Sequence, residues 1–162
     1  MTWEGWAHAV HLLGAMFWAG GMFFLVLVLM PIGRKVLPPK EYLALVHVVG
    51  RRFRNISWIV LPVVVATGVI KAARAVGSWE ALGTTPYGRT LMWKMAAVTI
   101  ALIIATAHDF WIGPRMTNSV REGASAATTV WRRWSRLSGL ALLVLVLAIL
   151  GLAVKLRMSY FE

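Results

Sequence analysis

Residues 140–154 read LALLVLVLAILGLAV, a run without a single polar side chain. Together with the residues from about 134 onward, this stretch reaches the roughly 20 residues that a helix needs to cross the hydrocarbon of a bilayer. Similar apolar stretches lie at about 7–30, 56–76 and 89–112. The pattern predicts an all-α integral membrane four-helix bundle, with a single transmembrane domain over residues 1–162.

Composition points to the same environment. Hydrophobic residues make up 59% of the chain, which is more than a small soluble domain tolerates. The first apolar stretch follows Met-Thr-Trp-Glu rather than a basic segment and is longer than the apolar part of a signal peptide, so we expect it to be retained. Because the chain has no cysteine, disulfides, thiolate metal sites and cysteine nucleophiles are excluded.

The formal net charge of +11 has an uneven distribution along the chain. Most basic residues lie in the first and third connections between spans, namely Arg34, Lys35, Lys40, Arg51, Arg52 and Arg54, and Arg115, Arg121, Arg132, Arg133 and Arg136. Basic residues are retained on the cytoplasmic side of membranes. The charge therefore predicts a multi-pass protein of a bacterial-type inner (cytoplasmic) membrane with both termini outside, and no nucleic-acid partner.

The connections carry helix signals of their own. We expect the first span to end near Pro31, and the helical pattern of residues 40–54 to continue into the second span. Pro86-Tyr87-Gly88 marks the turn before the third span. Residues 115–130 are rich in Ser, Thr and Ala and are expected to be partly helical.

Polar side chains at membrane depth are costly without partners, so they indicate function. Lys94 lies about five residues inside the third span. Its helix face continues through three alanines to His108, about 21 Å away at 1.5 Å per residue, so these two residues cannot share one metal ion. The alanines are Ala97, Ala101 and Ala105.

His11 lies about one turn inside the first span, at a depth similar to Lys94, and the two are expected to meet. Its helix face continues through Gly14, Trp18 and Gly21, where small residues allow a close approach of another helix or a flat ligand. His8 lies one turn earlier, whereas His47 and His108 lie toward the cytoplasmic side. The plainer alternative is that Lys94 extends to the outer interface, that His8 and His47 lie at the headgroups, and that His108 bonds locally next to Asp109.

Methionine offers a competing site. Met92 and Met95 share one helix face at the depth of His11, and thioether with imidazole suits Cu(I). That face is rotated by roughly 100 to 160° from Lys94 at about 100° per residue, so one small site would not use both.

Two stretches of the sequence are typical of one membrane family. Residues 85–94 read Thr-Pro-Tyr-Gly-Arg-Thr-Leu-Met-Trp-Lys, and they follow Arg52-Phe53-x-x-Ile56-Ser57-Trp58 and Thr67-Gly68. These segments resemble the CopD-like family, named for copper resistance protein D, over about residues 50–154. The resemblance implies copper handling.

The first span also resembles the HemJ-type protoporphyrinogen oxidases, which are small haem-b-binding membrane proteins. The similarity lies in His11 followed by Trp18-Ala19-Gly20-Gly21-Met22-Phe23-Phe24, and in Trp93, Lys94 and His108 of the third span. It implies that His11 and Lys94 are the important histidine and lysine.

These observations lead to a first hypothesis, a haem b protein with His11 as an axial ligand in a pocket opened by Gly14 and Gly21. Lys94 would be the opposite ligand, a propionate partner or a catalytic proton-handling group, and Arg89 or Arg74 would pair with propionates. The protein would then be an oxidoreductase or an electron carrier with a quinone or a periplasmic electron partner.

The alternative is a copper-handling protein that binds Cu(I) at its outer entrance and exchanges it with a periplasmic copper partner. Its ligands would be His8, His11, Met92 and Met95, with His47 and His108 as further metal candidates. A third hypothesis is a structural partner subunit, and the small-residue faces would support a homodimer as easily as a pocket.

Overall fold

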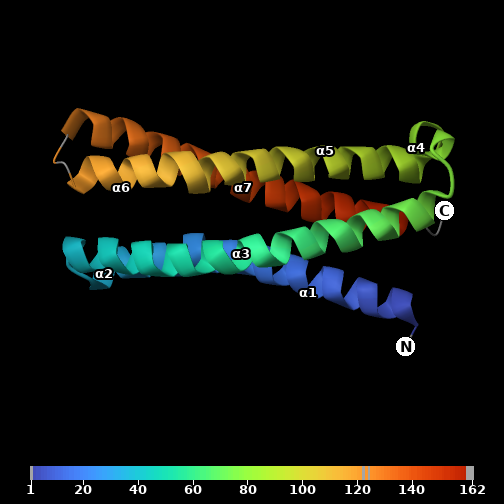
Figure 1. The fold of residues 1–162 in the computed structure, drawn as a ribbon, viewed down its shortest axis with the longest axis horizontal. Coiled ribbons are helices and arrows are strands. Elements are labelled where there is room, and N and C mark those ends of the chain that lie inside the picture. Colours follow the sequence, from blue (N-terminus) through green and yellow to red (C-terminus); the bar gives the residue numbers. More distant parts are fainter. Residues whose placement is uncertain (1, 122, 124, 160–162) are drawn as a thin grey trace. The chain divides into compact units, whose positions relative to one another are not determined.

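The computed structural model describes residues 2–121, 123 and 125–159, and every regular element in these ranges is helical (Figure 1). Four helical segments of this part are long and apolar enough to cross a membrane: Trp3–Val36, Pro39–Val76, Pro86–Ser119 and Ala126–Met158. The predicted all-α membrane class with four spans is confirmed, and the chain is a multi-pass membrane protein.

The helices are longer than the predicted spans. The second comprises 38 residues, or about 57 Å at 1.5 Å per residue, against a hydrocarbon thickness of roughly 30 Å. The excess lies mainly in the basic segments, where residues 39–54 and 113–119 continue the helices of the adjoining spans, as expected for residues 40–54. These helices therefore project beyond the bilayer on their basic side.

Contacts divide the chain into two compact units, residues 1–77 and 78–162, which we describe separately. The first is a hairpin in which α1 (Trp3–Phe23), η1 (Phe24–Leu29) and α2 (Met30–Val36) run back along α3 (Pro39–Val76). Leu37 is extended before Pro38, and Pro39 then opens α3, because a residue before proline avoids the helical region whereas proline suits the first helical turn.

Glycines on α1 allow the two helices of this hairpin to approach closely. A methyl group at Gly14 would overlap the Val64 side chain, and one at Gly21 would overlap the Phe53 ring. Phe53 also packs against Phe17, with ring centroids 5.8 Å apart. The hairpin is therefore held by side chains of α3 that fill the space over the small residues of α1.

A proline follows each of two π-helical turns, η1 and η2 (His108–Ile112). Pro31 and Pro114 lack an N–H, and in a regular α-helix their rings would collide with the carbonyl four residues earlier. The wider turn relieves this conflict, since Met30 N–H bonds to the Leu25 carbonyl and Gly113 N–H to the His108 carbonyl. The helix of the first span therefore continues past Pro31 to Val36.

The second unit is also a helical hairpin. The short helix α4 (Glu80–Thr84) precedes α5 (Pro86–Ala107), η2 and α6 (Gly113–Arg121), which pack against α7 (Ser125–Met158). Helix α6 and the start of α7 confirm that the third connection is partly helical. Ala101 and Ala105 are buried, as are Leu142 and Val146 of α7.

The turn into α5 explains the Thr-Pro-Tyr-Gly segment. The Thr85 hydroxyl accepts a hydrogen bond of 2.9 Å from Gly88 N and caps the helix, while Pro86 occupies its first turn. Gly88 lies directly under α4, where a methyl group would collide with the Ala81 carbonyl oxygen. Only glycine fits at this position.

Candidate metal-binding site

His11 has the best-defined polar environment in the first unit. Its ring is half-buried between α1 and α3, with Nδ1 2.9 Å from the Val64 carbonyl oxygen and 3.2 Å from Thr67 Oγ1. A carbonyl oxygen only accepts hydrogen bonds, so Nδ1 carries the proton, and in the neutral ring the lone pair lies on Nε2. This is the arrangement in which proteins hold a histidine that binds metal through Nε2.

Thr67 and Gly68 of α3 form the surface against which the His11 imidazole packs. The Thr67 hydroxyl donates to the Val63 carbonyl at 2.7 Å, which leaves its oxygen as an acceptor toward His11. A methyl group at Gly68 would lie 3.0 Å from His11 Cε1, closer than an ordinary contact. The Thr-Gly pair therefore fixes the ring in one orientation.

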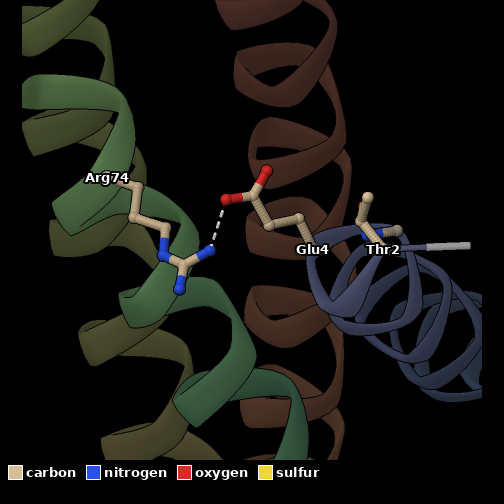
Figure 2. A network of polar contacts seen from close by, with 4 residues as sticks. Thr2, Glu4 and Arg74 are labelled. Atoms are coloured by element: carbon tan, nitrogen blue, oxygen red, sulfur yellow. Dashed lines mark hydrogen bonds and ion pairs between the residues drawn. The ribbon is translucent and has the colours of Figure 1, made fainter.

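Two further contacts join α1 to α3 toward the chain terminus. Lys71 Nζ donates to His8 Nδ1, and Arg74 donates to Glu4 Oε1 at 2.6 Å in an ion pair whose side chains are 52% and 70% exposed. Figure 2 shows the Arg74 guanidinium of α3 reaching the Glu4 carboxylate of α1, beside Thr2.

These contacts form an antiparallel series that we call the polar ladder: Glu4, His8 and His11 on α1 opposite Arg74, Lys71 and Thr67 on α3. Its steps on α1 rise by about 6 and 4.5 Å at 1.5 Å per residue. No cluster of three or more His, Asp or Glu side chains able to hold a metal occurs in the described part of the chain. In this part of the chain the ladder is therefore a row of paired polar side chains that join α1 to α3.

The face of α1 below His11 differs from the open pocket expected from the sequence. Val64 and Phe53 fill the space over Gly14 and Gly21, because α3 packs closely against these small residues. Trp18 lies on the same half-buried face. In this structure the glycines serve helix packing within the hairpin.

The predicted face of α5 is partly confirmed by its packing in the second unit. Ala101 and Ala105 are buried, and His108 Nδ1 lies 2.7 Å from Ser138 Oγ of α7. The Ser138 hydroxyl donates to the Trp134 carbonyl, so it accepts from His108, which makes an interhelical bond rather than the local one of the plainer alternative. Lys94 is half-buried on this helix. His11 and Lys94 belong to different units, so their pairing stays a prediction.

The other predicted site residues are exposed. Met92 and Met95 have 43% and 46% of their surface exposed on α5, and Arg89 is exposed near the start of that helix. His47 is exposed on the basic part of α3, where Arg51 donates to its Nε2.

Sequence reasoning missed the partners on α3. Lys71 and Thr67 were not linked to His8 and His11, although steps of three and four residues place 4, 8 and 11 on one helix face and 67, 71 and 74 on another. Two polar faces on neighbouring antiparallel helices were the available signal.

Comparison with protein-family models gives a match to copper resistance protein D over residues 47–156. The chain belongs to the copper resistance protein D family. The match includes Thr67-Gly68 and the 85–94 segment, which confirms the resemblance based on them. An uncharacterised protein of Aquifex aeolicus (strain VF5) is 28% identical over 152 residues, which cover 93% of each chain. No solved structure matches this family member.

Proposed function

We propose that this copper resistance protein D family member handles copper as cargo, binding it at the polar ladder with His11 Nε2 as the principal ligand. The observation that carries the proposal is the 2.9 Å bond from His11 Nδ1 to the Val64 carbonyl oxygen. This bond orients the ring and makes Nε2 the nitrogen through which the neutral ring would bind a metal. The family match supports copper over haem b.

The donor set suits transfer better than storage. Imidazole binds copper well, but the chain offers no thiolate, so affinity stays moderate. We further propose that Met92 and Met95 of α5, in the second unit, bind Cu(I) through their own thioethers. With both termini outside a bacterial-type inner membrane, as the distribution of basic residues indicates, the ladder faces a periplasmic copper partner.

The proposal is tested by Cu(I) competition titrations on purified protein with a chromogenic chelator under anaerobic conditions. His11→Ala is expected to lose most Cu(I) retention, whereas His47→Ala, which changes an exposed histidine on the basic part of α3, retains it. Equal retention by wild type and His11→Ala would overturn the role of His11. Absence of Cu(I) binding by wild type would overturn the function.

The same samples separate copper from haem. Optical spectra of protein expressed with supplied haem are expected to lack a Soret band. A Soret band that disappears in His11→Ala, with no copper bound, would instead support the haem b hypothesis and redox chemistry.

A further inference from the structure

In two pairs of the polar ladder, His8 with Lys71 and Glu4 with Arg74, a cationic side chain of α3 already contacts the residue of α1. The Lys71 ammonium donates to His8 Nδ1, and the Arg74 guanidinium donates to the Glu4 carboxylate. An imidazole lone pair is also a copper ligand, and a carboxylate attracts any cation by its charge. The side chains of Lys71 and Arg74 thus occupy positions at which the copper cargo would bind.

The two histidines of the ladder are held in opposite ways. His11 Nδ1 donates to a carbonyl, so its lone pair is on Nε2. His8 Nδ1 accepts from an ammonium, which has no acceptor capacity, so the Nδ1 lone pair is engaged by Lys71 and a neutral His8 ring carries its proton on Nε2. In this state copper can bind through His8 Nδ1 only by displacing Lys71.

The position of Lys71 on α3 allows its side chain to extend away from His8. It lies one turn before Arg74, near the end of α3 at Val76, and lysine side chains near helix ends extend readily to the membrane interface. Withdrawal removes one positive charge from the neighbourhood of the arriving Cu(I). The exchange is therefore a replacement of one monovalent cation by another.

We infer that the Lys71 ammonium competes with Cu(I) for His8 Nδ1 and thereby lowers the Cu(I) affinity of the polar ladder. The inference rests on the proposed function and deepens it. Because Lys71 competes for His8, the polar ladder binds copper less tightly. Weaker binding favours release of the copper to a periplasmic partner.

The test is a Cu(I) titration of the full-length protein in lipid nanodiscs, with the chelator described above. Lys71→Leu removes the competing donor and introduces no metal ligand. It is expected to bind Cu(I) about tenfold more tightly. A tenfold change in affinity corresponds to the lower end of the free energy that a hydrogen bond to a charged group contributes. Lys71→Arg, which keeps a charged donor, is expected to resemble wild type.

Two further variants identify the cause. In the double variant His8→Ala with Lys71→Leu the gain in affinity is expected to vanish, because His8 is the ligand that Lys71 releases. Lys40→Leu makes the same change at an exposed lysine at the opposite end of α3, outside the polar ladder, and is expected to leave Cu(I) affinity unchanged.

Unchanged or weaker Cu(I) binding by Lys71→Leu, or a gain that persists without His8, would overturn the competitor role while leaving the proposed function intact. Absence of Cu(I) binding in wild type and in every variant would overturn both.

Discussion

Substitution Gly68→Ala tests whether the orientation of the His11 ring matters. The added methyl group would lie 3.0 Å from His11 Cε1, and the ring must retreat by about 0.4 Å to reach an ordinary contact of 3.4 Å. Retreat along the line from Nδ1 to the Val64 carbonyl oxygen would stretch that bond from 2.9 to about 3.3 Å, beyond the usual range. A neutral hydrogen bond contributes about 1 kcal/mol, so Cu(I) affinity should fall about fivefold.

The assay is the Cu(I) titration, accompanied by thermal unfolding in the same detergent. Gly50→Ala is the matched control, because Gly50 lies on the same helix and nothing lies within 4 Å of its added methyl group. The control should keep wild-type affinity and gain roughly 0.5–1 kcal/mol of stability from the better helix propensity of alanine. Equal Cu(I) affinities for the two variants would refute the reasoning about ring orientation.

Three further predictions concern packing and topology. Gly14→Ala should destabilise the first hairpin by about 1–3 kcal/mol through overlap with Val64, whereas Gly20→Ala, with nothing within 4 Å, should not; equal thermal midpoints would contradict the packing. Ser138→Ala should cost about 1–3 kcal/mol by removing the acceptor for His108, and unfolding should show no such loss for Thr106→Ala, whose hydroxyl bonds only within its helix. In intact cells a membrane-impermeant maleimide should label Ser78→Cys but not Asn118→Cys, and the reverse pattern would invert the predicted orientation.

The spans and some of their faces could be predicted because lipid imposes a simple pattern. The long apolar runs predicted four helices, and the spacing of Ala101 and Ala105 predicted a common face, which is buried. Pro31 did not predict how far the helix continues, because a wider turn in the preceding residues accommodates a proline that a regular helix would reject.

The contacts of His11 with α3 were much harder to predict from the sequence. Its main partner is the carbonyl oxygen of Val64, a backbone atom without a sequence signal. The contact between His8 and Lys71 depends on the crossing of α1 and α3, which apolar spacing alone does not specify. Resemblance to the copper resistance protein D family identified Thr67-Gly68 without revealing that the pair supports an imidazole.

The central claim is that His11 binds copper, and X-ray absorption at the copper edge of Cu(I)-loaded protein tests it most directly. Wild type should show the outer-shell scattering of coordinated imidazole, and this scattering should weaken in His11→Ala while His47→Ala keeps it. Identical spectra for wild type and His11→Ala, or spectra without any imidazole contribution, would contradict the claim.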